Sequence, residues 1–119
     1  MNRPIKFRVW DKRENKGMST QNMLYDAQLH HLWQDFVDYP GSYELMQYTG
    51  CHDSSNNEIY EGDIVQYNNG DVIRIGYVGF MAGIFFLNYP DETDDELGYL
   101  LVSNLKVIGN KFEHSELLK

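Results

Sequence analysis

The chain has 119 residues, enough for one small domain or a small domain with an N-terminal extension. Its 10 basic and 18 acidic residues give a net charge of −8, which argues against binding nucleic acid through a generally basic surface. The single cysteine, Cys51, excludes an intramolecular disulfide, and neither a signal peptide nor a membrane-length apolar run is visible. We therefore expect a cytoplasmic protein that is not bound to a membrane.

Residues 1–41 are predicted to form a small N-terminal unit. In residues 5–10, three aliphatic or aromatic side chains alternate with Lys6, Arg8 and Trp10, the period-two pattern of a half-buried strand. Residues 18–25 are expected to return as a second strand after a polar turn. The segment 26–39 carries an apolar stripe with helical spacing, and Pro40 and Gly41 should end it. The members of the stripe are Leu29, Leu32, Trp33 and Phe36.

Residues 42–119 are predicted to be mainly β. Short alternating runs are separated by turn residues, including Asn68-Asn69-Gly70, and such a series favours a sandwich or a small barrel. Barrel closure would remove exposed strand edges. An acidic loop is expected over residues 91–98, a strand over 99–102 and a short helical turn at the C-terminus. The side chains expected to point inward are Ile64, Val72, Ile75, Val78, Phe85, Leu87, Leu101, Val107 and Ile108.

The stretch from Tyr48 to Tyr67 is predicted to contain a structural corner of this barrel. A glycine between two acidic residues inside an apolar-flanked strand indicates a bulge or a sharp turn. We expect Asp63 to accept backbone N–H bonds there, rather than to act as a catalytic acid or base. The residues assigned to the corner are Gly50, Asp53, Tyr60, Glu61, Gly62 and Asp63.

Three groups of residues raise alternative chemistries, and the sequence favours none of them. His30, His31, Cys51 and His52 lack the ligand spacing of a zinc site. The run Asp91–Glu96 lacks the central glycine and distant glutamate of a calcium-binding EF-hand loop. Adjacent residues such as Cys51 and His52 rarely meet in catalytic geometry. We therefore expect no catalytic residues, no metal and no cofactor.

The aromatic side chains are too numerous for the interior of a small barrel. Either some of them form a contact surface for a partner, or they join the N-terminal unit to the barrel. The candidates for a contact surface are Trp10, Trp33, Tyr39, Tyr48 and Tyr67. A local basic face is also conceivable, since Arg3, Lys6, Arg8, Lys12, Arg13 and Lys16 are clustered near the N-terminus.

Four motifs together resemble the YopX family, a group of small proteins of phages and prophages. They are IKFRVWDK at residues 5–12, YELMQYTGCHD at 43–53, EIYEGDIVQY at 58–67 and VIGNKFEHSELL at 107–118. The resemblance implies a mainly β fold, with an SH3-like barrel over residues 42–119 preceded by a smaller hairpin and short-helix unit over 1–41. It also implies a function that is uncharacterised, and it supplies no catalytic residues.

The expected function is that of a non-enzymatic phage or prophage accessory protein in the cytoplasm of a bacterial host. We expect it to bind a protein partner, from the host or the phage, or to self-associate as a homo-oligomer. The alternative is a nucleic-acid-binding small barrel, or an acidic mimic of DNA that acts on a host DNA-binding protein. Nucleic acid is the less favoured partner, because the net charge is −8.

Overall fold

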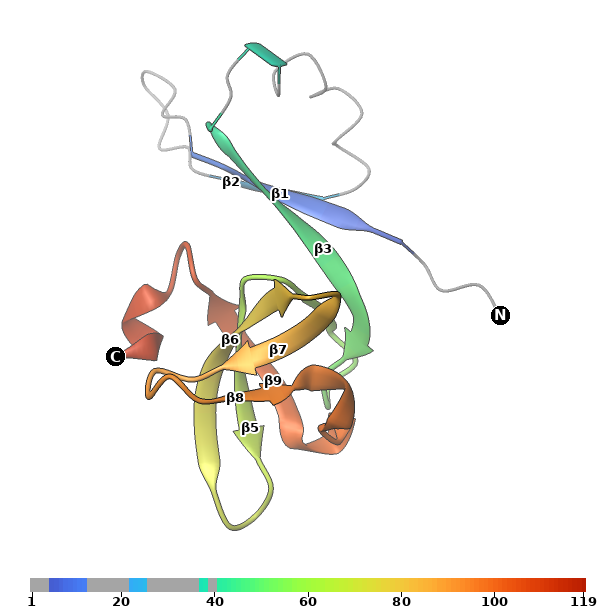
Figure 1. The fold of residues 1–119 in the computed structure, drawn as a ribbon, viewed down its shortest axis with the longest axis vertical. Helices are drawn as coiled ribbons and strands as arrows, with labels where there is room; N and C mark the ends of the chain where they lie inside the picture. Colours follow the sequence, from blue (N-terminus) through green and yellow to red (C-terminus); the bar gives the residue numbers. More distant parts are fainter. Residues whose placement is uncertain (1–4, 13–21, 26–36, 39–40) are drawn as a thin grey trace. The chain divides into compact units, whose positions relative to one another are not determined.

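The computed structural model describes residues 5–12, 22–25, 37–38 and 41–119 (Figure 1). The chain divides into two compact units, Met1–Gln47 and Tyr48–Lys119. Each unit is described by itself. The division falls within strand β3 (Tyr43–His52), and the boundary expected after Gly41 stays a prediction.

The first unit contains an antiparallel arrangement around β1 (Phe7–Asp11). β1 pairs on one side with β2 (Asn22–Tyr25) and on the other with the first half of β3, so that Val9 lies opposite both Leu24 and Leu45. The alternation of residues 5–10 therefore does mark a strand. The described part of the expected return strand is β2, whereas residues 18–21 lie outside the described residues. The helix expected over 26–39 also lies almost wholly outside them.

The second unit is built on a curled, five-stranded antiparallel sheet with the order β8-β7-β6-β5-β9 (Figure 1). The prediction of a mainly β fold is confirmed, and the curled sheets form a half-barrel. Among the described residues no ladder joins the two edge strands, β8 and β9. The bounds of the strands are β5 (Asp63–Asn68), β6 (Ile73–Met81), β7 (Ile84–Asn88), β8 (Asp94–Glu96) and β9 (Leu105–Asn110).

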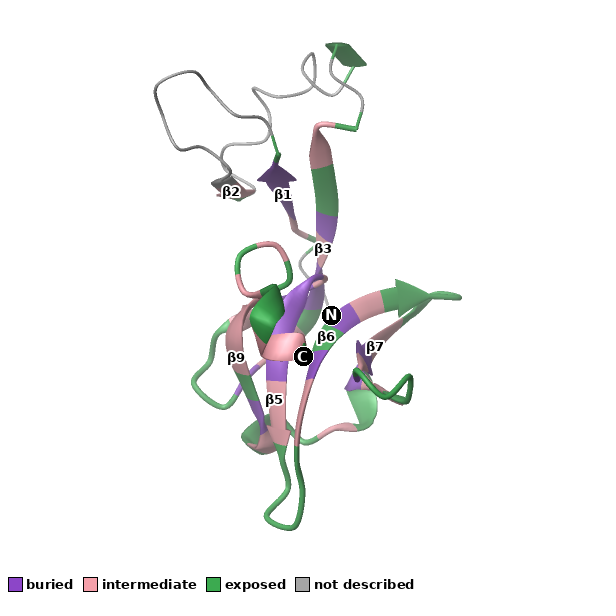
Figure 2. Ribbon diagram, turned by 90° about the vertical axis from the view of Figure 1, so that its left-hand side faces the viewer, coloured by how far each residue is buried: buried purple, intermediate pink, exposed green. Residues whose placement is uncertain are grey.

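The second half of β3 and the short β4 (Glu58–Tyr60) complete this unit. β4 pairs with β3 through a register shift, and Ile59 of β4 joins the hydrophobic core of the five-stranded sheet. Figure 2 shows the buried core residues along β5 and the middle of β6, whereas the end of β6 is exposed. The core comprises Ile59, Val65, Val78, Leu87, Tyr89, Leu97 and Leu105.

The turn between β5 and β6 forms as the sequence predicts. The side chain of Asn69 accepts the backbone N–H groups of Asp71 and Val72, and that of Asn68 accepts the N–H of Gly70. These local bonds let the chain reverse without leaving the turn's N–H groups unsatisfied.

Two expectations about residues 91–102 are wrong in detail. The expected acidic loop contains the strand β8, and the expected strand 99–102 instead lies across two 3-10 helices, η1 (Leu97–Tyr99) and η2 (Val102–Asn104). Of the expected inward set, Val72 and Leu101 are exposed, because Val72 precedes β6 and Leu101 lies between the two 3-10 turns. The expected C-terminal helical turn is present as η3 (Ser115–Leu118).

Candidate functional site

Asp53 lies in the loop between β3 and β4 and is only 2% exposed. One carboxylate oxygen accepts the backbone N–H groups of Ser55 at 2.9 Å and Asn57 at 2.8 Å. The other accepts the side-chain amide of Asn57 at 3.1 Å and the backbone N–H of Val107 at 2.9 Å. A single side chain therefore fixes the shape of its own loop and binds that loop to β9.

The same loop occupies the outer edge of β9. The backbone N–H of Ser54 donates to the carbonyl oxygen of Leu105 at 2.8 Å, next to the bond between Asp53 and Val107. Burial acts to raise the pKa of the Asp53 carboxyl, but the hydrogen bonds from Val107, Asn57 and Ser55 outweigh it and hold the pKa below its ordinary value. The carboxylate is thus stabilised in its charged form, as a backbone acceptor.

A second corner lies between β4 and β5. Gly62 has a φ of +83°, which a residue with a side chain adopts only with strain; its N–H donates to Val78 and its carbonyl accepts from Lys111, both at 2.8 Å. Asp63 is 3% exposed and accepts the backbone N–H of Tyr60 at 2.8 Å. The turn is therefore fixed by its own aspartate and bonded to β6 on one side and to the segment after β9 on the other.

We expect Asp63→Ala to lower the free energy of unfolding by about 2 kcal/mol, because it leaves a buried backbone N–H without its acceptor. Urea denaturation followed by tryptophan fluorescence or circular dichroism measures this. Asp71→Ala is the matched control, since Asp71 is exposed on the β5–β6 turn and its loss should change stability little. Equal effects of the two substitutions would contradict the structural role of Asp63.

The residues assigned to one corner therefore belong to two. Asp53 serves the loop that meets β9, whereas Tyr60, Gly62 and Asp63 serve the β4–β5 turn. Gly50 lies within β3 with a φ of +84°. Sequence patterns identify both aspartates as turn residues, but the bond from Asp53 to Val107 spans 54 residues and has no local signal.

The residues considered for metal binding or catalysis do not converge in the part of the chain that the structure describes. No group of three or more metal-binding side chains is found among the described residues. His52 lies 3.3 Å from the hydroxyl of Tyr48, and His114 accepts the backbone N–H of Asn110 at 3.1 Å. Cys51 is a free, half-buried thiol, and His30 and His31 lie outside the described residues.

The acidic run after β7 is held by specific bonds. The Arg74 guanidinium lies 3.6 Å from the centre of the Tyr89 ring and forms an ion pair with Asp91 at 3.0 Å. Tyr89 donates its hydroxyl to Asp95 at 2.6 Å, and burial, with the Asp95 carboxylate, raises the pKa of that hydroxyl well above its ordinary value. Hydrogen bonds from Thr93 lower the pKa of Asp91. The run Asp91–Glu96 is therefore held in a defined conformation by these bonds.

A small pocket of about 220 Å³ lies in the second unit between β3, the β6–β7 turn and η1. We call it the seam pocket, because the described ladders join β3 only to β1 and β4, and β7 only to β6 and β8. Its lining residues are Thr49, Cys51, Gly83, Ile84, Phe85, Glu96, Leu97 and Gly98.

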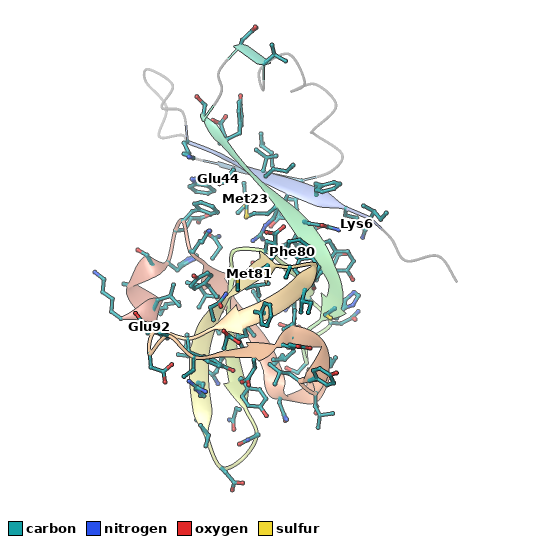
Figure 3. The ribbon with its side chains drawn as sticks, viewed as in Figure 1. Lys6, Met23, Glu44, Phe80, Met81 and Glu92 are labelled. Atoms are coloured by element: carbon teal, nitrogen blue, oxygen red, sulfur yellow. The ribbon has the colours of Figure 1, made fainter. Side chains whose placement is uncertain are left out.

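Exposed apolar side chains occur in the segments that adjoin the seam pocket. Phe80 and Met81 lie at the end of the β6–β7 hairpin, as Figure 3 shows, and Ile84 begins β7 beside the pocket. Tyr99 follows the pocket residue Gly98 and is 84% exposed. We call Phe80, Met81, Ile84 and Tyr99 the rim patch.

The described residues that the sequence suggested as a contact surface are not highly exposed. Trp10 and Tyr48 are buried, and Tyr67 packs half-buried against the core. Trp33 and Tyr39 lie outside the described residues. Contact of these five residues with a partner stays a prediction. Aromatic content alone could not point to the rim patch, because its position depends on where β6, β7 and β8 end.

The alternative of a basic face near the N-terminus gains little support in the described part of the first unit. Arg8 is buried, and Lys12 forms an ion pair with Glu44 at 2.9 Å. Both cations are therefore less accessible to phosphates than the sequence suggests. No helix in the described ranges has the length and apolarity needed to cross a bilayer.

One of the comparisons with known proteins shows a family. The family model described as YopX protein matches residues 6–119, nearly the whole chain. The crystal structure of protein EF1440 from Enterococcus faecalis is similar to this chain with a TM-score of 0.59 and 24% sequence identity, over 99% of this chain and 100% of the other. At that identity the likeness shows the fold alone. A comparison with curated proteins found no match. The extent of the family match shows that this chain belongs to the YopX family.

Proposed function

We propose that this YopX-family chain is a non-enzymatic accessory protein of phage or prophage origin that acts in the bacterial cytoplasm by binding another protein or a second copy of itself. The observation that carries this proposal is the rim patch around the seam pocket. Phe80 is 49% exposed, Met81 63% and Tyr99 84%, and Ile84 is exposed as well, so four large apolar side chains face solvent in segments that adjoin the seam pocket. Clustered exposed apolar residues of this kind are typical of interaction sites.

The two buried aspartates support a binding role over a catalytic one. Asp53 accepts hydrogen bonds from three backbone N–H groups and one amide, and Asp63 from a buried backbone N–H. Both carboxylates therefore stabilise the chain's own turns, which leaves them poorly placed to exchange protons with a substrate. The nucleic-acid alternative gains no support from the described basic residues Arg8 and Lys12.

We expect Met81→Asp to reduce binding about 10-fold or more, because it places a charge in the centre of an apolar contact. Ile73→Asp is the matched control: Ile73 has the same 63% exposure as Met81 and lies at the opposite end of β6. The measurement is quantitative capture of host proteins on immobilised protein, together with light scattering over a range of concentrations to detect self-association.

The proposal requires that binding or self-association be seen with the wild type, persist in Ile73→Asp and be lost in Met81→Asp. A strictly monomeric wild type that retains no protein would overturn it. Retention that both aspartate variants share with the wild type would overturn the assignment of the rim patch.

A further inference from the structure

The seam pocket has the size of a single side chain and not of a cofactor. Its volume of about 220 Å³ is below the range of about 300–1,000 Å³ usual for small-molecule sites. A cavity of about 150 Å³ already holds a benzene ring, so one bulky aliphatic or aromatic side chain fits. Ile84, Phe85, Leu97 and the half-buried Cys51 supply an apolar lining for such a group.

The strand beside the pocket has an uncovered edge. β8 pairs only with Phe86, Leu87 and Asn88 of β7, so Ile84 and Phe85 extend beyond it. The turn before them is formed by Ala82 and Gly83, both with positive φ, which is the geometry of a tight two-residue hairpin turn. An extended segment that adds to an exposed strand edge gains main-chain hydrogen bonds and places alternate side chains in adjoining pockets.

The charge around the pocket is negative. Glu96 lines it, and Asp94 and Asp95 precede Glu96 in β8. Glu96 lies opposite Phe86, and since side chains alternate along a strand, it shares a face of the sheet with Ile84. The pocket lining includes no lysine or arginine, and Arg74, the nearby cation of the acidic run, is paired with Asp91. A partner with basic residues would be attracted to this rim.

We propose that the seam pocket receives one bulky apolar side chain from an extended, basic segment of a partner protein, with Glu96 and its acidic neighbours selecting the flanking positive charges. This inference rests on the proposed function and names the chemistry of the partner. Self-association is an outcome that the test separates from it.

The test uses two short synthetic peptides with the same central leucine and phenylalanine, one flanked by lysines and the other by glutamates. Binding to the intact chain is measured by fluorescence polarisation of labelled peptide. Cys51 provides an internal reporter, because it is the single cysteine of the chain and lines the pocket. Its alkylation by N-ethylmaleimide should slow several-fold when the lysine peptide is bound, and binding should weaken as salt is raised.

Two variants address the pocket and its charge separately. Gly98 lines the pocket, and a Cβ at this position would meet no atom within 4 Å, so a side chain can start there without a clash at its Cβ. Gly98→Leu is designed to occupy the pocket from this position. We expect it to reduce lysine-peptide binding about 10-fold, with Gly98→Ala as the milder control. Glu96→Lys should reduce binding about 5-fold, whereas Asp71→Lys on the exposed β5–β6 turn should not. Circular dichroism and melting curves establish that each variant is folded.

The outcomes are distinguishable. Three results together support the inference. The chain binds the lysine peptide more tightly than the glutamate peptide, Gly98→Leu loses that binding, and the bound peptide slows alkylation of Cys51. Equal binding of both peptides, binding to neither, or unchanged alkylation of Cys51 overturns it, even if Met81→Asp still abolishes partner capture and the proposed function stands. Capture that is insensitive to Met81→Asp would instead overturn the assignment of the rim patch, and a strictly monomeric wild type that retains no protein would remove the proposed function itself. A wild type that forms dimers through the rim patch and ignores both peptides would replace the basic partner with a second copy of the chain.

Discussion

Replacing Asp53 by alanine is expected to lower the free energy of unfolding by about 3 kcal/mol at neutral pH. The substitution removes the acceptor of the backbone N–H groups of Ser55, Asn57 and Val107, and no other side chain reaches all three. It also releases the loop from β9. Urea denaturation monitored by circular dichroism measures the loss, and hydrogen exchange at Val107 should show which bond is broken.

Asp53→Asn is the informative control for the charge. It preserves the shape but replaces one oxygen with a donor, so we expect a loss of about 1–2 kcal/mol. Because the folded-state pKa of Asp53 lies below its unfolded value, the charged carboxylate stabilises the fold above the unfolded pKa of about 3.9, and this stabilisation is lost as the pH falls through the folded pKa. The stability difference between wild type and Asp53→Asn should therefore narrow in acid. A difference that is constant from neutral pH down through that range would contradict the role of the carboxylate.

Gly76→Ala is expected to destabilise the second unit by about 3 kcal/mol. Gly76 lies in β6, where a Cβ would be only 2.4 Å from the backbone oxygen of Asn88 and 3.0 Å from the ring of Tyr89. The backbone of Asn88 cannot move away from the added Cβ without disturbing the β6–β7 ladder. The steric strain would therefore distort the sheet. Thermal and urea unfolding of the purified variant measure the change.

Gly79→Ala is the control in the same strand. It shows whether the loss of stability in Gly76→Ala comes from the close backbone contact or from replacing any β6 glycine by alanine. The atom nearest to a Cβ at Gly79 is the side-chain amide nitrogen of Asn88, at 2.5 Å, and a side chain can rotate away. We expect a loss of about 1 kcal/mol or less. If Gly79→Ala were as destabilising as Gly76→Ala, close approach of the Asn88 backbone would not be the cause.

Local patterns predicted the strands whose alternation is strong. The alternation of residues 5–10, the Asn68-Asn69-Gly70 turn and the interruption at Glu61–Asp63 each correspond to a feature of the structure. Local patterns did not predict β8, and they wrongly predicted a strand over residues 99–102. Three consecutive acidic residues have little intrinsic strand preference, and Asp94–Glu96 become a strand only because β7 lies beside them. Leu101 was expected in the core because leucine is a large apolar residue. It lies instead between two 3-10 helices and is 68% exposed.

The sequence predicted less of the candidate site than of the fold. Asp53 and Asp63 could be identified as turn-forming residues, because aspartate commonly accepts nearby backbone N–H groups. The seam pocket could not be identified, because it depends on β8 ending opposite Phe86 and on Cys51 meeting the β6–β7 turn. Exposure of Met81 and burial of Trp10 are likewise properties of packing and not of composition.

The pairing of β5 with β9 has a consequence for synthesis of the chain. β5 lies in the interior of the sheet, yet one of its two neighbours, β9, follows the other strands of this sheet in chain order. The bond that holds the loop of Asp53 is likewise made to Val107, 54 residues later. The nascent second unit must therefore keep its apolar strands from associating until Leu105–Asn110 has emerged. This interval is when chaperones would have most to contribute.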